Sequence, residues 1–263
     1  MSITPLQHFY ESQQLNPELV YHLFRQADSL RVNKSFIKQK PLEGKILASL
    51  FYEPSTRTRF SFESAMIRLG GNILSTENAS EFSSSIKGET IEDTVRVLHS
   101  YADCIVLRHF AEGTAKKAAQ LSNVPIINAG DGGGQHPTQS LLDIYTIQRE
   151  IGRLHDLKVA IVGDLANGRT ARSLCYLLAK FERNHIIFLA PDNLKMKPDI
   201  KHYLQMHETS YEEASSLPII LPQVDVVYMT RLQKERMRPN EYKKAKGKYV
   251  ITLENLLLMR KDA

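Results

Sequence analysis

The chain has 263 residues, of which 42% are hydrophobic and 24% charged, proportions typical of a globular protein rather than a disordered one. It contains no run of about 18 apolar residues and no cationic start followed by an apolar stretch, so we expect a cytoplasmic protein with no membrane partner. The net charge of +5 is concentrated in residues 231–263, which carry +6. The only aromatic residues in this basic segment are Tyr242 and Tyr249. Such a pattern favours a solvated surface over a nucleic-acid partner.

The two cysteines, Cys104 and Cys175, lie far apart in apolar surroundings, and the sequence has no CxxC or His-rich spacing. We therefore expect no metal site, no disulfide framework and a reducing compartment.

The first half of the chain alternates predicted helices and strands. Apolar residues spaced by three and four predict helices, and short apolar runs bounded by turn residues predict strands. In chain order the expected elements are helix 15–30, strand 44–51, helix 57–70, strand 72–75, helix 90–101, strand 104–107 and strand 124–128. In the helix 57–70 we expect Phe60, Phe62, Ala65, Met66 and Leu69 to face inward.

The pattern restarts after a helix at 137–151. The expected elements that follow are strand 158–162, helix 170–181, strand 185–190, helix 198–206 and strand 224–229. The alternation predicts an α/β fold of two lobes, each a parallel sheet flanked by helices, joined by the interdomain helix 137–151. We place the two domains at residues 1–148 and 149–263.

The strongest local motif is EPSTRTR, residues 53–59, between a strand and the start of a helix. Free backbone N–H groups of a first helical turn, with hydroxyl groups and a guanidinium beside them, form a phosphate-binding cradle. Ser55 and Thr56 could instead be plain helix caps, but capping does not require two arginines in the same turn.

A second junction, VAIVGDLANGRT at 159–170, has Gly163 and Gly168 at the spacing of a nucleotide phosphate loop. Arg169 stands where that loop needs lysine, and Asp225 lies near the start of its strand instead of the end, which argues against a nucleotide triphosphatase. The guanidinium of Arg169 is better suited to bind a carboxylate. If Arg231 faces the same cleft, the two could hold a dicarboxylate.

The third motif is the glycine-rich stretch NAGDGGGQHPTQ at 128–139, which predicts a loop that approaches a ligand closely. It brings His136 and Gln139 to the start of a helix. A single histidine at such a place is often a cap or a buried structural group, but Arg108, just after another predicted strand, favours a polar pocket at the carboxyl ends of the strands.

Six segments together resemble the aspartate carbamoyltransferase catalytic-chain family. They are FYEPSTRTRF (51–60), KGET (87–90), VLRH (106–109), GDGGGQHPTQ (130–139), GDLANGRTARSL (163–174) and MTRLQKER (229–236). The resemblance implies that the first lobe binds carbamoyl phosphate, that the second binds aspartate, and that the product is carbamoyl aspartate, an intermediate of pyrimidine biosynthesis.

The resemblance also implies a role for each matching residue. The phosphate would lie on Ser55, Thr56, Arg57, Thr58 and Arg108. Thr58, Arg108 and His136 would polarise the carbamoyl oxygen, and Gln139 would hold the amide end. Lys87, Arg169, Arg231 and Gln233 would bind the carboxylates of aspartate. Ser83 and Lys87 would reach the site of a neighbouring subunit, which implies a homotrimer, with or without regulatory chains.

Fixed donors aimed at the oxyanion formed during amine attack lower the barrier without a covalent nucleophile, a metal or another cofactor. The related ornithine carbamoyltransferases share the Ser-Thr-Arg-Thr-Arg and His-Pro-x-Gln turns, but Glu53, Arg169 and the Arg231-x-Gln233 pair fit an acidic acceptor better. The family's later His-Pro-Leu-Pro-Arg turn is absent from this sequence. A non-catalytic carbamoyl-phosphate-binding subunit acting through a partner is therefore an alternative expectation, as is a shortened chain.

Overall fold

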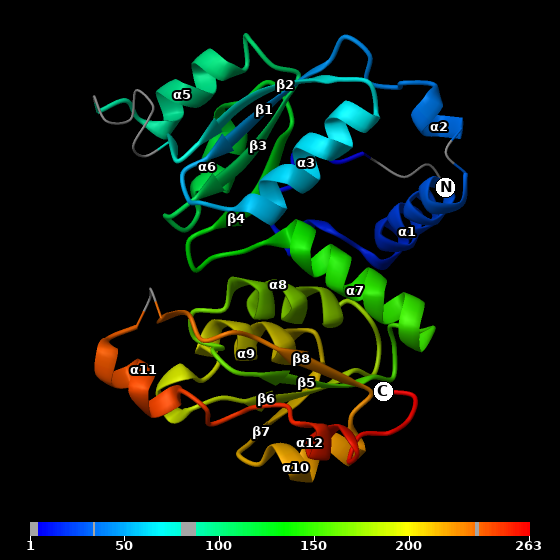
Figure 1. The fold of residues 1–263 in the computed structure, drawn as a ribbon, viewed down its shortest axis with the longest axis vertical. Coiled ribbons are helices and arrows are strands. Elements are labelled where there is room, and N and C mark those ends of the chain that lie inside the picture. The colour runs from blue at the N-terminus through cyan, green and yellow to red at the C-terminus, as the bar shows by residue number, and fades with distance from the viewer. Residues whose placement is uncertain (1–4, 34, 80–87, 235–236) are drawn as a thin grey trace. The chain divides into compact units, whose positions relative to one another are not determined.

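The computed structural model describes residues 5–33, 35–79, 88–234 and 237–263. The chain forms two compact units, Met1–Gln139 and Ser140–Ala263. Each unit contains one four-stranded sheet in which all the strand pairs are parallel (Figure 1). The α/β fold expected from the alternating pattern is confirmed, while the domain boundary at residue 148 stays a prediction.

The first sheet has the strand order β2-β1-β3-β4. The elements of this unit are η1 (Ser12–Gln14), α1 (Pro17–Val32), α2 (Ser35–Lys38), β1 (Ile46–Phe51), α3 (Thr56–Arg68), β2 (Asn72–Glu77), α5 (Ile91–Leu98), β3 (Cys104–His109), α6 (Thr114–Leu121) and β4 (Ile126–Asp131). A bridge between Phe9 and Ile127 adds the N-terminal segment beside β4.

Helices cover both faces of the first sheet. Because successive side chains of a strand point to opposite faces, β1 contributes to a cluster on each side. Leu47 and Phe51 of β1 pack with Met66 of α3 on one face. Ala48 and Leu50 belong to the opposite cluster, which includes residues of α5 and α6. Continuous apolar strands of this kind are typical of a parallel sheet buried between helices.

The second sheet has the strand order β7-β6-β5-β8. It follows α7 (Pro137–Ile151), which begins in the first unit. The further elements are β5 (Lys158–Val162), α8 (Arg169–Leu178), β6 (His185–Leu189), η3 (Asp192–Leu194), α9 (Pro198–Met206), β7 (Ser210–Ala214), α10 (Leu217–Ile220), η4 (Leu221–Gln223), β8 (Val226–Met229), α11 (Pro239–Ala245) and α12 (Leu253–Leu256).

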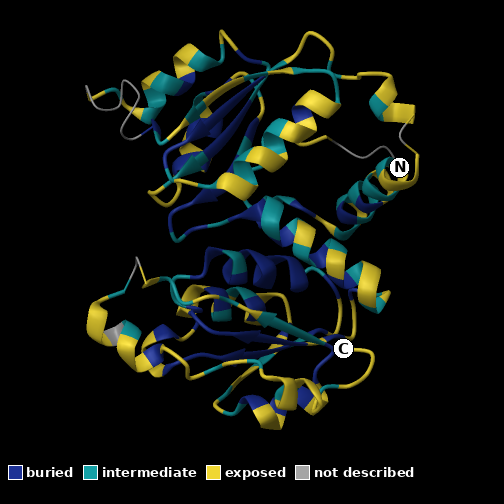
Figure 2. Cartoon of the chain, in the orientation of Figure 1, coloured by how far each residue is buried: buried dark blue, intermediate teal, exposed yellow. Residues whose placement is uncertain are grey.

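Every residue of helix α8 is buried except Thr170, which is half-buried (Figure 2). In the second unit, an apolar cluster includes Ala160 and Val162 of β5, and Tyr249 and Ile251 of the basic C-terminal segment pack against this cluster. This segment is therefore anchored by apolar side chains although most of its lysines are exposed.

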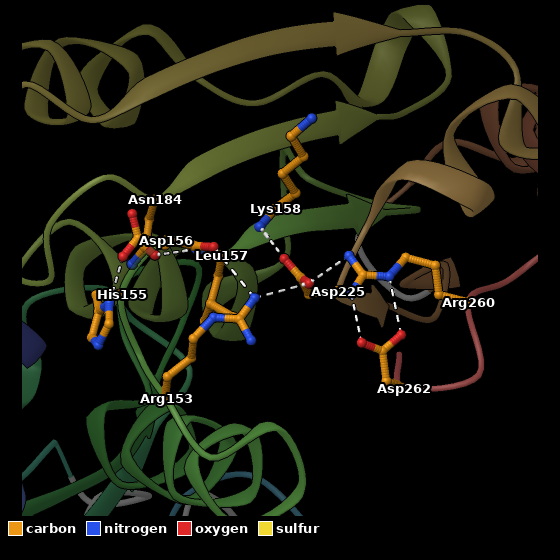
Figure 3. Close-up of polar contacts among 9 residues, drawn as sticks. All are labelled: Arg153, His155, Asp156, Leu157, Lys158, Asn184, Asp225, Arg260 and Asp262. Carbon is orange, nitrogen blue, oxygen red and sulfur yellow. Dashed lines mark hydrogen bonds and ion pairs between the residues drawn. The ribbon is translucent and has the colours of Figure 1, made fainter.

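The start of the second sheet is held by a polar network around Asp225 (Figure 3). The buried Asp225 carboxylate accepts hydrogen bonds from the backbone N–H of Lys158 at 2.8 Å, from Arg153 at 3.1 Å and from Arg260 at 3.0 Å. Asp262 in turn forms a bidentate pair with Arg260. One carboxylate thus joins β5, the segment before it and the C-terminal segment.

Helix α6 and strand β7 are among the elements that were not expected from the sequence, and one helix face differs from the prediction. Helix α6 (TAKKAAQL) and strand β7 (SYEEA) are polar or alanine-rich, so neither has a strong apolar period. On α3, Met66 is buried as predicted, but Phe60 is 53% exposed and Ala65 is exposed as well. The inward assignment of Phe60 and Ala65 was wrong because α3 covers the sheet with a narrower stripe than its apolar residues suggest.

No helix among the described residues is both long and apolar enough to cross a membrane. The described residues also contain no group of three or more His, Cys, Asp or Glu side chains placed to hold a metal ion. Both cysteines are free thiols. Burial raises the pKa of Cys104 to about 11, so its thiol stays protonated and a poor nucleophile at neutral pH.

Candidate functional site

The polar residues expected to bind phosphate lie where the order of the first sheet reverses direction. From β1 the chain moves to β2 on one side, whereas β3 and β4 lie on the other side. Phe51 at the end of β1 is paired in register with Arg108 of β3, and the N–H of Tyr52 donates to the Arg108 carbonyl at 2.9 Å. Open α/β sheets bind ligands at the carboxyl edge at such a reversal.

Helix α3 begins directly after this edge, at Thr56. Ser55 occupies the N-cap position but its side chain makes no capping hydrogen bond, which removes the plain capping explanation for this residue. The first-turn N–H groups of a helix need an acceptor and attract anions. The α3 N-terminus is therefore suited to bind a phosphate.

The two arginines of the first α3 turn have different environments. Arg57 is exposed and makes no hydrogen bond or ion pair with any residue that the structure describes. Arg59 pairs with Glu77 of β2 at 2.7 Å and lies 3.7 Å from Glu63. Arg59 therefore ties α3 to the sheet, and Arg57 is the guanidinium left available for a ligand.

Glu63 reinforces this tie between α3 and the sheet. Its Oε1 accepts hydrogen bonds from Ser49 of β1 at 2.9 Å and from Ser75 of β2 at 2.5 Å. The position of the α3 N-terminus relative to the strands is thus fixed by polar contacts as well as by the packing of Met66.

Arg108 extends from the end of β3 and lies 3.5 Å from Glu53 of the loop that precedes α3. It also donates to the Ala129 carbonyl of β4 at 3.3 Å. Thr58 is half-buried on the first turn of α3. The structure thus places Ser55, Thr56, Arg57, Thr58 and Arg108 at one edge of the first sheet.

His136 and Gln139 follow β4 at the same edge. His136 is 6% exposed, and its Nδ1 lies 3.3 Å from the Thr138 hydroxyl. Gln139 is half-buried in the first turn of α7, and its N–H donates to the His136 carbonyl at 3.1 Å. His136 is therefore a buried, oriented group and not a solvated cap.

The second sheet reverses direction between β5 and β8, and the residues expected to bind carboxylates follow these two strands. Val162 is paired in register with Met229, and the Thr230 N–H donates to the Val162 carbonyl at 2.8 Å. Gly163 has φ +117°, and a Cβ there would lie 2.5 Å from the Thr230 carbonyl oxygen. Only glycine permits so close an approach of the two loops.

Arg169 begins α8 and is 8% exposed, whereas Arg231 is exposed and Gln233 is half-buried. The Gln233 side-chain amide donates to the Asn167 carbonyl at 2.7 Å. The loop that leads to Arg169 and the loop that carries Gln233 are thus in direct contact at one edge of the second sheet.

The sequence analysis did not single out two residues of this edge, Asp164 and Asn167. Asp164 is fully buried and accepts from the Asn167 N–H at 3.0 Å and from the Gln233 N–H at 3.4 Å. The sequence does contain a turn signal, because Asp164 comes directly after Gly163 at the end of an apolar strand and Asn167 precedes Gly168. Its long-range contact with Gln233 had no signal in the sequence.

Ser83 and Lys87, the residues expected to reach a neighbouring subunit, lie outside the described residues. The other predicted site residues form two groups, one at the carboxyl edge of each sheet. A cavity of about 230 Å³ near Lys195 and Tyr249 and an open groove of about 540 Å³ near Thr114 contain none of them.

The family comparison covers nearly all of the chain. Residues 7–149 match the family described as "Aspartate/ornithine carbamoyltransferase, carbamoyl-P binding domain". Residues 155–263 match "Aspartate/ornithine carbamoyltransferase, Asp/Orn binding domain".

Similar curated proteins include plant and archaeal sequences. The chain is 54% identical to the chloroplastic aspartate carbamoyltransferase of Arabidopsis thaliana over 256 residues, which cover 96% of this chain and 66% of that protein. It is 50% identical to the chloroplastic protein of Oryza sativa subsp. japonica, with 96% and 72% coverage. The chain thus spans about two thirds of the length of these plant relatives.

Solved structures of similar proteins have the same fold. The catalytic subunit of Methanocaldococcus jannaschii aspartate transcarbamoylase matches with a TM-score of 0.84 and 48% identity over 95% of this chain and 82% of that one. The Trypanosoma cruzi enzyme in complex with carbamoyl phosphate matches with a TM-score of 0.88 and 34% identity over 97% and 83% of the two chains. Both family matches and these identities lead to one conclusion: the chain belongs to the aspartate/ornithine carbamoyltransferase family.

Proposed function

We propose that this protein transfers the carbamoyl group of carbamoyl phosphate to the amine of aspartate, giving carbamoyl aspartate and phosphate. The observation that carries the proposal is the N-terminus of α3, where Ser55 makes no capping bond and the exposed Arg57 has no described partner. An oxyanion such as phosphate satisfies both the N–H groups and the guanidinium.

In this proposal the phosphate binds Ser55, Thr56, Arg57, Thr58 and Arg108. Thr58 and Arg108, together with His136, also donate to the carbamoyl oxygen, and Gln139 holds the amide end of the carbamoyl group. Amine attack forms a C–N bond and gives a tetrahedral oxyanion. The bond from the carbamoyl carbon to the phosphate oxygen then breaks, and phosphate leaves with the electron pair and takes up the proton that the amine nitrogen loses. Donors already fixed around the oxygen stabilise that charge without reorganisation, and alignment of the two reactants contributes about 7–11 kcal/mol.

Aspartate is the proposed acceptor because the second sheet presents Arg169, Arg231 and Gln233 at one edge. Lys87, from the residues outside the description, completes the proposed set. Two guanidinium groups and an amide match two carboxylates. The T. cruzi enzyme has been solved in complex with carbamoyl phosphate and aspartate, which supports the same substrates here.

The test is product formation by the purified 263-residue chain supplied with carbamoyl phosphate, with aspartate and ornithine as parallel acceptors. We expect carbamoyl aspartate and no citrulline. Citrulline alone would identify an ornithine carbamoyltransferase. Carbamoyl-phosphate binding without either product would indicate the non-catalytic alternative.

We also propose that the chain assembles with copies of itself, as a homotrimer in which Ser83 and Lys87 complete a neighbour's site. Support comes from exposed apolar side chains on α3 and on the edge strand β2, where Phe60, Ile67 and Leu74 are 53%, 62% and 47% exposed. Sedimentation equilibrium should give three times the chain mass of 29.9 kDa. A monomer at micromolar concentration would contradict this proposal.

A further inference from the structure

A buried carboxylate next to the first-sheet site, that of Asp131, joins the loop that follows Arg108 to the loop that leads to His136. Asp131 is the last residue of β4 and is 5% exposed. We propose that Asp131 is a positioning residue that fixes Arg108 and His136 relative to each other, a role that rests on the proposed function. It does not touch the substrate in this proposal and acts through the backbone of both loops.

One carboxylate oxygen of Asp131 holds the loop that follows Arg108. Its Oδ2 accepts a hydrogen bond from the Gly113 N–H at 2.9 Å, and the Ala115 N–H also donates to the carboxylate. Gly113 is the N-cap of α6 and has no side chain that could cap the helix. Asp131 therefore caps α6 from a distant part of the sequence, and its negative charge lies at the positive end of that helix.

The other oxygen holds the loop that leads to His136. Oδ1 accepts from the Gln135 N–H at 3.0 Å and from the Asn128 side-chain amide at 3.2 Å. The Asp131 N–H donates to the Gln135 carbonyl at 3.1 Å, which closes the glycine-rich loop. The next residue is His136, so its backbone position follows from this closure.

The two loops also pack directly against each other. The Gly132 N–H donates to the His109 carbonyl at 2.8 Å. Gly132 has φ +47°, and a Cβ there would lie 2.6 Å from the Phe110 carbonyl oxygen. Because there is no room for a side chain between the loops, a shift of one moves the other.

The electrostatics agree with a carboxylate held for structural precision. Burial raises the pKa of Asp131 above its ordinary value, and the hydrogen bonds from Gln135, Asn128, Gly113 and Ala115 offset only part of this rise. All four groups donate, so the side chain at position 131 must accept hydrogen bonds through both of its terminal atoms. An amide in place of the carboxylate would direct an N–H₂ group at backbone N–H groups, so even an isosteric substitution should displace the loops.

The test compares Asp131→Asn with Asp103→Asn, the same substitution at the opposite edge of the sheet. Asp103 precedes β3 and, like Asp131, accepts from a backbone N–H, that of Ile46 at 2.9 Å; its other oxygen pairs with Lys45 at 2.7 Å, so neither contact involves the site loops. The melting temperature of each variant is measured first. The kcat/KM for carbamoyl phosphate and its Kd by calorimetry are then measured at a temperature well below unfolding. We expect both variants to melt earlier, with Asp131→Asn alone losing about 10²-fold in kcat/KM, the effect of a misplacement near 1 Å.

Unchanged kcat/KM and Kd in Asp131→Asn, or equal losses in both variants, would overturn the positioning role. If the wild-type chain binds carbamoyl phosphate without forming product, the proposed function fails, and a weaker Kd in Asp131→Asn alone still supports the role of Asp131. Should Asp131→Asn not fold, Gly132→Ala displaces the same two loops with Asp131 intact and should weaken the same Kd. A wild-type Kd in Gly132→Ala would then overturn the inference.

Discussion

Gln233 and Asn167 lie on loops that follow different strands of the second sheet, and the Gln233 side-chain amide donates to the Asn167 carbonyl at 2.7 Å. The buried carboxylate of Asp164 lies behind this contact and accepts from the backbone N–H groups of both residues. Strand pairing alone brings β5 and β8 together, but Asp164 determines how their loops meet.

Replacing Asp164 by alanine should therefore weaken aspartate binding. Two buried N–H groups lose their acceptor, at a cost of about 1–3 kcal/mol for each unsatisfied group, and Gln233 is no longer held. We expect the KM for aspartate to rise at least about tenfold, since 1.4 kcal/mol is a factor of ten, while the Kd for carbamoyl phosphate is unchanged. Steady-state kinetics and calorimetry measure the two. Asp192→Ala, at a 92% exposed side chain of the same unit, is the control and should behave as wild type.

Replacing Arg57 by alanine should weaken phosphate binding without affecting stability. A guanidinium that makes a charge-assisted bond contributes about 1.5–3 kcal/mol, so we expect the Kd for carbamoyl phosphate and for inorganic phosphate to rise about 10- to 100-fold. The melting temperature should stay the same because Arg57 is exposed and has no described partner. Arg68→Ala, at the last turn of the same helix, is the matched control. An unchanged carbamoyl-phosphate Kd in Arg57→Ala would refute the assigned phosphate site.

Asp225 should matter for stability and not for substrate affinity. Its buried carboxylate holds the start of β5, Arg153 and Arg260 (Figure 3). Both arginines are more than a third exposed and can be hydrated again, so we expect Asp225→Asn to lower the free energy of unfolding by about 1–3 kcal/mol. Asp262→Asn, at an exposed carboxylate bound to Arg260 alone among the described side chains, should cost less than Asp225→Asn because solvent screens the pair. Equal losses in urea titrations of the two variants would contradict this prediction.

The pair of Arg172 and Asp199 should make stability depend on pH. Arg172 is buried on α8 and binds both oxygens of Asp199, at 3.1 and 2.6 Å. The Arg172 hydrogen bonds hold the pKa of Asp199 below its ordinary value. The stabilisation is therefore present above the unfolded pKa of about 4 and is lost as pH falls through the folded pKa.

Asp199→Asn tests this dependence. At pH 7 the variant should be less stable than wild type, toward the low end of about 1.5–3 kcal/mol because Asp199 is half-exposed. Unfolding titrations at pH 7, 5 and 3 should show the difference shrinking at the lowest pH. A constant difference across this range would mean that the ion pair does not contribute.

The sequence by itself determined the elements with a strong local signal. The bounds of α7, β5 and α9 agree with the prediction, because each begins at a turn or proline and carries a clear apolar pattern. The alternation of strands and helices was enough to predict two parallel sheets, which the structure confirms, whereas the phosphate site at the turn that contains Arg57 stays a prediction.

The tertiary structure decided what depends on residues distant in the chain. Helix α6 has a weak apolar pattern and a glycine N-cap, and it is capped by Asp131 of β4. Phe60 is apolar but exposed, because the sheet is covered by other residues of α3. Arg57 and Arg59 are equivalent in the motif, and only the contact of Arg59 with Glu77 separates the guanidinium that anchors α3 from the one that we propose binds phosphate. Local pattern fixes which segments form strands and helices, but buried carboxylates find their N–H partners only after the chain has folded.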